Sequence, residues 1–431
     1  MIRRSAPSPR DPVDLVIESV GAQGDGLARL AGRPVFVAGT LAGERVRARI
    51  GASRGEGLAA SVITLLERSP RRVAPVCRHF GTCGGCALQH MADDDYAAWK
   101  WGLAVAALRQ RGVDADVVAP LERTTPGTRR RAAFAFLRRA SDVVVGFNER
   151  LSHRIIDLAE CPLLHPALAA VLGPLRELLG GLTAPRSTGD VIVGWGETGL
   201  DVIIVGCGTL DLGRRERLAA FAEEHDLARL SWCPAENQPM ETVVRRRPAR
   251  VVFAGVAVEP PPGAFLQPSV DGEACIVRHL LAAVGTASPV ADLYAGVGSL
   301  TFPLAMAGAE VHAVDGAAEA IAALREATHH ARLTRVSAEV RDLAIRPLAA
   351  RDLARFAAVV FDPPRAGARP QAEALAHGGP PLVVAISCNP ATLARDARIL
   401  VDGGYRLETV VPVDQFPWSP HLELVATFSR R

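Results

Sequence analysis

The carboxyl-terminal part of the chain, from about residue 263 onward, alternates short apolar runs with helical stretches. Three of the runs lead directly into a polar residue, namely Asp315, Asp362 and Cys388. Strands that alternate with helices form a parallel, doubly wound sheet, in which ligands bind at the carboxyl ends of the strands. The apolar runs are Val290–Tyr294, Val311–Val314, Ala357–Phe361 and Leu382–Ser387, and the helical stretches are Ser299–Ala307 and Ala317–Ala331.

The amino-terminal part has a different pattern. Between residues 13 and 67, short strand-like runs are separated by turn glycines, which is typical of a small OB-like barrel. Asp94–Arg111 has the apolar spacing of a helix, which Gly112 ends. Strand-like runs with one or two helices between residues 126 and 255 predict a mixed α+β domain.

We therefore predict an α/β protein with a doubly wound, Rossmann-like domain, an amino-terminal barrel and an α+β middle domain. The predicted barrel is 11–68. The middle domain combines 69–92 with 126–255, and the doubly wound domain combines 93–125 with 256–431.

Composition excludes some classes of protein. The chain has 431 residues, 49% of them hydrophobic, and no apolar run long enough to span a membrane. Met1–Pro12 is polar and lacks the apolar core of a signal peptide. We expect a cytoplasmic protein with no membrane association and no obligate protein partner. The net charge of +3 decides little, and Lys100 is the only lysine, so nearly all basic residues are arginines.

The run from Asp292 to Thr301 reads as a strand, a tight turn and the start of a helix. Gly296 and Gly298 allow a ligand to approach the backbone closely, but the third glycine of a dinucleotide site is absent. Asp315 ends the next strand, where a carboxylate can accept the hydroxyls of a ribose. This pattern favours S-adenosylmethionine as the cofactor. Asp342, near the end of the following strand, is a candidate contact to its adenine, or a helix cap.

Two further strand ends carry reactive side chains. Pro363 and Pro364 make a rigid turn that holds Asp362 and Arg365 in fixed directions. Cys388 lies at a strand tip just before a helix, whose amino terminus is expected to lower the pKa of the thiol. A buried, unreactive cysteine is the alternative.

Near the end of the chain, His421-Leu422-Glu423 follows Asp414-Gln415-Phe416-Pro417. We expect the side chains of His421 and Glu423 to lie on the same side of a strand, because their spacing is two residues.

Five ordered motifs resemble those of the RNA uracil-5-methyltransferase family, and the resemblance covers most of the chain. Departures from the family pattern occur at Pro268-Ser269, Ala295, Ser299 and Trp418-Ser419-Pro420. The motifs are Phe265-Leu266-Gln267, D-L-Y-x-G-x-G at 292–298, D-P-P-R-x-G at 362–367, S-C-N-P-A-T-L-x-R-D at 387–396, and D-x-F-P with H-x-E at 414–423.

The chemistry of this family assigns roles to these residues. Carbon 5 of uracil is a poor nucleophile, and a thiolate that adds at carbon 6 makes it electron-rich. The resemblance implies Cys388 as the nucleophile and Glu423 as the acceptor of the proton from carbon 5, with Asp362 and Arg365 beside them. The cofactor contacts it implies are Gln267, Tyr294, Gly296, Ser299, Asp315, Asp342 and Asp362.

Cysteines are clustered before the predicted helix. Cys77, Cys83 and Cys86 lie within ten residues, a spacing typical of a metal or cluster site. With Cys161, four thiolates suit zinc or iron–sulfur equally well. The set resembles the [4Fe–4S] ligands of the 23S ribosomal RNA branch of the family, and the barrel resembles its TRAM domain. Cys207, Cys233 and Cys275 have no motif around them and are interpreted as packing residues.

RNA is the expected partner, and ribosomal RNA is favoured over transfer RNA. Two arginine clusters are candidates for contacting phosphates or bases, although a solvated surface is the alternative for each. They are 129–131 with 138–139, and 245–247 with Arg250. The target uridine is expected to flip out of its stack into the cleft.

Three other functions are compatible with parts of this sequence. Transfer RNA could be the substrate of the same reaction. A radical S-adenosylmethionine enzyme would need a C-x3-C-x2-C motif, whereas the spacing here is x5 and then x2. A non-catalytic iron–sulfur RNA-binding protein would be expected to lack Cys388 or Glu423, and both are present.

Overall fold

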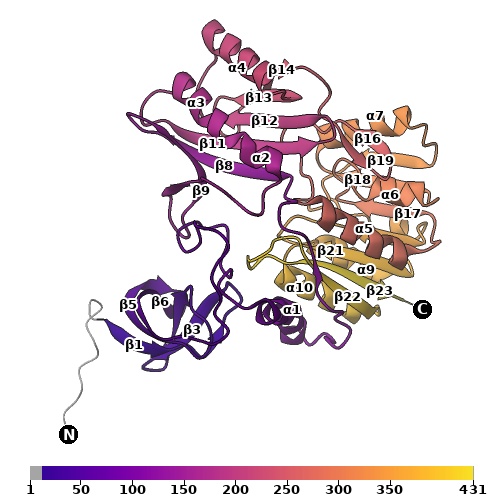
Figure 1. Cartoon of the computed structure of the whole chain (residues 1–431). Coiled ribbons are helices and arrows are strands. Elements are labelled where there is room, and N and C mark those ends of the chain that lie inside the picture. Colours follow the sequence, from indigo (N-terminus) through magenta and orange to yellow (C-terminus); the bar gives the residue numbers. More distant parts are fainter. Residues whose placement is uncertain (1–11, 431) are drawn as a thin grey trace. The chain divides into compact units, whose positions relative to one another are not determined.

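A computed structural model describes residues 12–430 (Figure 1). Of the polar segment Met1–Pro12, residues 1–11 lie outside the described residues. The chain divides into two compact units. The first contains the described residues up to Leu103, together with Glu149–Ser152 and Phe416–Pro420. The second contains Ala104–Asn148, His153–Gln415 and the chain from His421 onward.

The first unit begins with a six-stranded sheet in the order β1-β5-β6-β4-β3-β2. Inward-facing residues such as Val35, Val37 and Val46 are fully buried and alternate with exposed ones, as the two-residue period of a strand requires. The glycine-punctuated pattern between residues 13 and 67 thus forms the barrel that the sequence predicts. Its strands are β1 (Val13–Val16), β2 (Ser19–Val20), β3 (Asp25–Leu30), β4 (Arg33–Ala38), β5 (Arg45–Arg54) and β6 (Gly57–Glu67).

Helix α1 (Asp93–Gln110) follows a cysteine-bearing loop. Three aspartates in its first turn complement the helix dipole. Within the first unit, Lys100 is buried, and its ammonium donates to the hydroxyl of Tyr96 and to the carbonyl oxygens of Phe416 and Ser419. The single lysine of the chain therefore ties the 416–420 segment to α1.

The second unit contains a seven-stranded, mostly antiparallel sheet in the order β10-β9-β8-β11-β12-β13-β14. Leucines of α3 pack against Phe134 and Phe136 of β8 in one core. The elements are β8 (Arg131–Arg138), β9 (Val143–Asn148), β10 (Ile155–Asp157), α2 (Pro166–Ala170), α3 (Leu172–Leu182), β11 (Thr188–Gly196), β12 (Gly199–Val205), α4 (Leu212–Glu224), β13 (Arg229–Cys233) and β14 (Glu241–Arg245), followed by the hairpin β15 (Val251–Phe253) and β16 (Val256–Val258).

The same unit contains an eight-stranded sheet in the order β19-β18-β17-β20-β21-β23-β22-β7, coloured orange to yellow in Figure 1 except for β7. The first five strands are parallel, and β23 runs antiparallel to both of its neighbours. The strands are β7 (Glu122–Arg123), β17 (Val290–Leu293), β18 (Val311–Asp315), β19 (Val336–Val340), β20 (Ala358–Phe361), β21 (Leu382–Ser387), β22 (Arg406–Asp414) and β23 (Glu423–Ser429). The helices are α5 (Val270–Val284), α6 (Thr301–Met306), α7 (Ala318–His330), α8 (Ala350–Leu353), α9 (Arg369–Gly378) and α10 (Pro390–Asp402).

The buried central strands of this sheet confirm the predicted α/β fold class. Every residue of β17 and β20 is buried, as expected for parallel strands covered on both faces. The strand order switches at β17. The next two strands in the chain, β18 and β19, lie on one side of β17, and the following two, β20 and β21, lie on the other. Such a switch opens a crevice beyond the carboxyl ends of the two central strands.

In residues 12–430, no helix is both long and apolar enough to cross a membrane.

Candidate functional site

The carboxyl ends of β17, β20 and β21 lie side by side. β17 pairs with β20 from Val290↔Ala358 to Leu293↔Phe361, and β20 pairs with β21 in parallel. The register therefore places the residues that follow these strands, Tyr294, Asp362 and Cys388, at one edge of the sheet.

The turn after β17 is held in an unusual backbone conformation. Tyr294 has φ 61°, Gly296 has φ 53° and Gly298 has φ 98°. A positive φ is uncommon for a tyrosine, and such strain is concentrated at functional sites. A Cβ at Gly298 would also overlap the ring of Phe302. The positive φ at both positions and the close approach of Phe302 to Gly298 explain why the turn contains glycines.

Asp315, at the end of β18, fixes this turn. Its carboxylate accepts hydrogen bonds from the backbone N–H of Gly296 at 2.9 Å and of Ala317 at 2.7 Å. Burial, together with the charges of Asp396, Asp342 and Asp315, raises the pKa of Tyr294 to about 12. These three carboxylates therefore lie near enough to act on the tyrosine hydroxyl. Ser299 lies half-buried on the same turn.

Asp292 is the most deeply buried acid of the turn. Its Oδ2 accepts a hydrogen bond from Thr301 at 2.6 Å, while its Oδ1 has no hydrogen-bond partner. Burial, and after it the charges of Asp362 and Asp315, raises the pKa of Asp292 to about 7. A buried acceptor without a partner is costly, so this atom fits a ligand that brings a cation or an N–H group.

These residues fit S-adenosylmethionine. Asp315 offers lone pairs for ribose hydroxyls, the glycine turn admits the nucleoside, and the acidic surroundings suit an ammonium group and a sulfonium. Asp342 lies two residues beyond β19, at the strand end that the sequence predicts.

Cys388 follows β21 and is half-buried. Asn389 caps α10: its Oδ1 accepts the N–H of Ala391, and its Nδ2 donates to the carbonyl oxygen of Arg365 at 3.2 Å. The predicted lowering of the pKa of Cys388 is wrong. Burial, followed by the charges of Glu423 and Asp362, raises the pKa of Cys388 to about 11, although the charge of Arg365 lowers it.

Glu423 is brought beside Cys388 by the antiparallel pairing of β21 with β23. That register ends at Ser387↔Leu424, so the next pair of positions along it is 388 and 423. Glu423 is buried, whereas His421 precedes the strand. The prediction that His421 and Glu423 share one side of a strand is therefore wrong, because the strand begins only at Glu423.

A chain of amides links the two carboxylates nearest to Cys388. Gln267 donates through Nε2 to Oδ2 of Asp362 at 2.9 Å. Gln415 donates through Nε2 to Oε1 of Gln267 and to Oε2 of Glu423, both at 2.8 Å. Burial raises the pKa of Asp362 and of Glu423, and the charge of Asp362 raises that of Glu423 further.

Sequence reasoning missed Gln415. It occupies the variable position of the D-x-F-P motif, and a variable position in a motif carries no signal by itself. Gln267 was predicted as a cofactor contact, and its amide is bonded to Asp362 and Gln415. Its contact with the cofactor stays a prediction. Arg365 is exposed, and its backbone oxygen also accepts from Oγ1 of Thr392, which ties the proline turn to α10.

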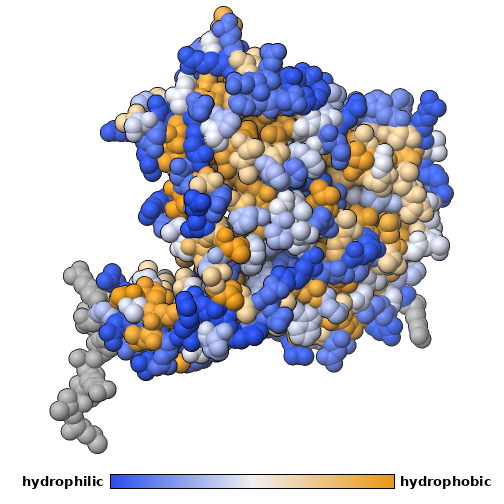
Figure 2. All heavy atoms as spheres, in the orientation of Figure 1, coloured by the Kyte–Doolittle hydropathy of each residue, from blue (hydrophilic) through white to orange (hydrophobic). Residues whose placement is uncertain are grey.

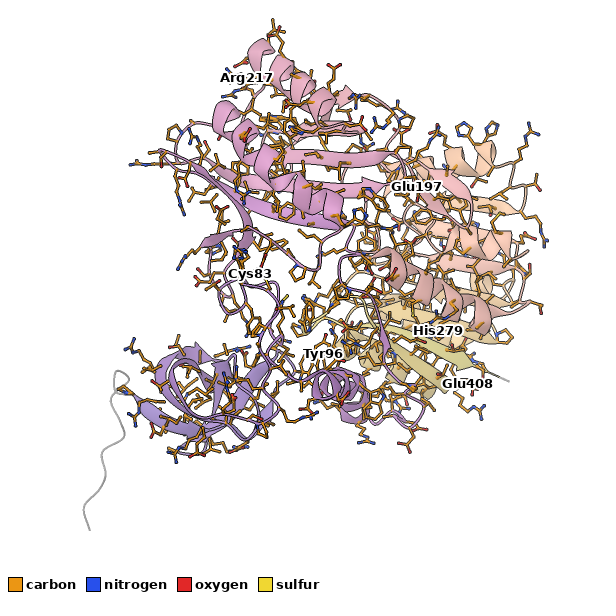
Figure 3. The ribbon with its side chains drawn as sticks, viewed as in Figure 1. Cys83, Tyr96, Glu197, Arg217, His279 and Glu408 are labelled. Atoms are coloured by element: carbon orange, nitrogen blue, oxygen red, sulfur yellow. The ribbon has the colours of Figure 1, made fainter. Side chains whose placement is uncertain are left out.

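The predicted cluster cysteines lie in both units of the chain. Cys77, Cys83 and Cys86 belong to the first unit and Cys161 to the second, and all four are half-buried. The Cys77 thiol lies near enough to Cys83 to raise the pKa of Cys83, after the larger effect of burial. The N–H of Gly85 points at Sγ of Cys83, 3.5 Å away. Figure 3 labels Cys83, which lies in a loop.

The remaining cysteines lie in packed surroundings. Cys207 borders the middle-domain core, and burial raises its pKa to about 12. Cys233 donates to the carbonyl oxygen of Ala235 at 2.9 Å. Cys275 lies on α5 near His279, which Figure 3 labels. Arg278 lies 3.5 Å from Sγ of Cys275 and 3.0 Å from Glu122, and supplies the positive charge there.

One of the arginines predicted to contact RNA is instead part of a buried ion pair. Arg130 is buried, donates to the carbonyl oxygen of Gln267, and pairs with Glu273 at 2.5 Å. Breaking such a pair costs about 3–5 kcal/mol. The prediction that Arg130 contacts RNA is therefore wrong.

In the second cluster, Arg246 and Arg247 pair with Asp226, and Arg245 pairs with Glu259. Figure 2 shows hydrophilic residues over the neighbouring α4 and β14. Arg139 pairs only with exposed Asp142, at 3.4 Å, and stays accessible, as Arg250 does. Ion pairs at an exposed surface contribute little energy and can be exchanged for phosphate.

The switch in strand order at β17, the glycine turn and the distal carboxylate define an S-adenosylmethionine-dependent methyltransferase. Residues 257–431 match the family model described as tRNA (Uracil-5-)-methyltransferase, and residues 11–63 match the TRAM domain. The chain is 46% identical, over 96% of its length and 97% of the relative's, to an uncharacterized RNA methyltransferase of Brucella suis. It belongs to the RNA (uracil-5-)-methyltransferase family.

One other relative and one solved structure have more specific names. The 23S rRNA (uracil(1939)-C(5))-methyltransferase RlmD of Alkalilimnicola ehrlichii is 34% identical over 100% of this chain and 99% of its own. The Pyrococcus abyssi tRNA (uracil-54, C5)-methyltransferase, solved with S-adenosyl-L-homocysteine, matches with a TM-score of 0.75 over 96% of this chain and 100% of its own, at 23% identity. The latter match supports the fold. This chain is an S-adenosylmethionine-dependent RNA uracil-C5 methyltransferase.

Proposed function

We propose that this enzyme methylates carbon 5 of a uridine in 23S ribosomal RNA, with Cys388 as the nucleophile and Glu423 as the proton acceptor. The observation that carries the proposal is the β21–β23 register, whose continuation puts position 388 opposite the buried Glu423 at the carboxyl end of β21. Ribosomal RNA is favoured because the relative named for it aligns with the whole chain.

The residues divide the reaction between them. The Cys388 thiolate forms a bond to carbon 6 of the uracil, and the electrons of the C5–C6 double bond make carbon 5 nucleophilic. S-adenosylmethionine supplies an electrophilic methyl group on a positively charged sulfur. Glu423 then takes the proton from carbon 5, the double bond re-forms, and the bond to Sγ breaks to release 5-methyluridine and the thiolate.

Charge near Cys388 controls the first step. The carboxylates of Asp362 and Glu423 disfavour the thiolate, whereas the guanidinium of Arg365 favours it. We infer that Arg365 and the cationic cofactor together offset the two carboxylates when the site is filled. Gln267, Tyr294, Gly296, Ser299, Asp315, Asp342 and Asp362 are the proposed contacts of the cofactor.

An iron–sulfur cluster on Cys77, Cys83, Cys86 and Cys161 is part of the proposal. The proximity of Cys77 to Cys83 and the N–H of Gly85 aimed at Sγ of Cys83 support two of the four ligands, since such N–H groups stabilise ligating thiolates. Anaerobically purified protein is expected to be brown and to contain iron and sulfide. Cys161→Ser should lose both, Cys207→Ser should keep both, and a colourless zinc protein would contradict the cluster.

We also propose that the enzyme is cytoplasmic. The choice of substrate is tested with 23S ribosomal RNA and transfer RNA, both purified from a strain that lacks the enzyme. Labelled S-adenosylmethionine should transfer its methyl group to the ribosomal RNA and yield 5-methyluridine on digestion. Preferential labelling of transfer RNA would overturn the choice of substrate while leaving the chemistry intact. Binding of both RNAs with no transfer to either would favour a non-catalytic RNA-binding protein.

A further inference from the structure

Gln415 lies in the second unit, immediately after β22, and its side chain is buried. Its amide nitrogen donates to Glu423 and to Gln267, each at 2.8 Å. Because Gln267 uses its own Nε2 to donate to Asp362, its Oε1 must accept, and this fixes which way the amide of Gln415 faces. A flipped amide would place an oxygen against two other oxygens.

The hydrogen bond distinguishes the two oxygens of Glu423. Oε2 accepts the N–H of Gln415, whereas Oε1 is buried and has no hydrogen-bond partner. An unpartnered buried oxygen is the better acceptor for an incoming proton, because protonation there displaces no existing N–H donor. The amide also prevents the carboxylate from rotating to exchange the two atoms.

The first turn of α5 holds Gln415 in place. Gly272 faces its side chain so closely that a Cβ there would lie 2.5 Å from Oε1 and 2.7 Å from Cβ of Gln415. Oε1 of Gln415 is buried without a hydrogen-bond partner, so its orientation follows from the two donor contacts on the other side of the amide.

We propose that Gln415 is a positioning residue for proton removal: it binds Oε2 of Glu423, leaves Oε1 to take the proton from carbon 5, and couples Glu423 to the Gln267–Asp362 pair. This inference rests on the proposed role of Glu423. Its hydrogen bond also stabilises the ionised form of Glu423, since it lowers the pKa that burial and Asp362 raise.

The test replaces Gln415 with methionine, which has a similar length and no N–H group. Turnover should fall about 100-fold, the lower end of what a positioned base contributes. The covalent enzyme–RNA adduct should accumulate on a denaturing gel, because release waits for proton removal. The acid limb of the pH–rate profile should move to higher pH, while the KM for S-adenosylmethionine stays within about threefold.

A matched control uses another buried glutamine. Gln371 accepts the N–H of Leu348 and donates to its carbonyl oxygen, and it does not contact the carboxylate pair. Gln371→Met should lower the melting temperature without accumulation of adduct or a change in the pH profile. If Gln415→Met folds poorly, Gln415→Glu keeps the size, removes the donor at high pH and should move the acid limb further upward.

The Glu423→Gln variant, measured in the same assays, separates the proposal that Glu423 is the base from the proposal that Gln415 positions it. If Glu423→Gln fails to accumulate adduct, the base is misassigned and both proposals fall. If Glu423→Gln accumulates adduct but Gln415→Met and Gln415→Glu do not, or if their pH profiles match the parent, only the role of Gln415 is overturned.

Discussion

The cofactor turn and the amide–carboxylate network occupy neighbouring strand ends, but they are assembled differently. The turn is built from one short segment, 292–301, and its principal partner Asp315 comes from the adjacent strand. The network draws Gln267, Asp362, Gln415 and Glu423 from four separate places in the chain. In the proposed function, the local segment binds the cofactor that many methyltransferases share, whereas the network adjusts the chemistry at carbon 5.

The largest expected effect removes the nucleophile. Cys388→Ala should lower methyl transfer by at least about 10⁴-fold, because no other group can activate carbon 5. Binding of S-adenosylmethionine, measured by calorimetry, should stay within about twofold of the parent, since the turn is untouched. Turnover near the parent level would contradict the assignment of cofactor binding to the turn and of nucleophilic attack to Cys388.

The next effect concerns the base. Glu423→Gln should slow product release by about 10²- to 10⁴-fold and leave RNA covalently bound, because a neutral amide cannot take the proton. In the parent enzyme, burial raises the pKa of Glu423 to about 8, so the base is ionised only as pH rises through that value. The rate in the parent should therefore increase with pH from about pH 6 to about pH 9, and a flat profile would count against Glu423.

A smaller effect is expected at Asp315. Asp315→Ala removes the acceptor of two backbone N–H groups and the proposed ribose partner. A loss of about 1–3 kcal/mol, or roughly 5- to 150-fold in cofactor affinity, should follow. The fraction of adduct formed at saturating cofactor should not change, and accumulation of adduct in this variant would contradict the separation of the two regions.

The smallest effect is on stability. Folding raises the pKa of Asp292 from 3.8 to about 7, so the folded state holds a proton that the unfolded state has released between these values. Stability should therefore fall as pH rises through that window and be lowest above it. Asp292→Asn should flatten this dependence and raise the melting temperature at neutral pH, while cofactor binding weakens. A lower melting temperature at pH 8 would contradict this account.

Much of the fold could be predicted because it is encoded locally. The run Leu382–Ser387 matches β21 residue for residue, and Asp94–Arg111 matches α1 with a shift of one residue at each end. The helix predicted from Ser299 begins at Thr301, since the glycine turn continues through residues 299 and 300. The structure divides into two compact units, and the predicted division into three domains stays a prediction.

Three of the errors and omissions share a physical cause: each concerns a contact between residues that are not neighbours in the sequence. The thiol pKa of Cys388 depends on Glu423 and Asp362, which no local pattern reveals. Arg130 looks like a surface cation until Glu273 is placed beside it. Gln415 gains meaning only through partners that lie 148 and 8 residues away.

The parent enzyme acting on RNA that contains 5-fluorouridine tests the central chemistry most directly. Fluorine replaces the proton that Glu423 is proposed to remove, so the reaction should stop after methyl transfer with the RNA bound to the protein. Digestion and mass spectrometry should locate the methylated fluorouracil on Sγ of Cys388. Attachment to another residue, or methylation of ordinary RNA by an enzyme that forms no such adduct, would contradict the account.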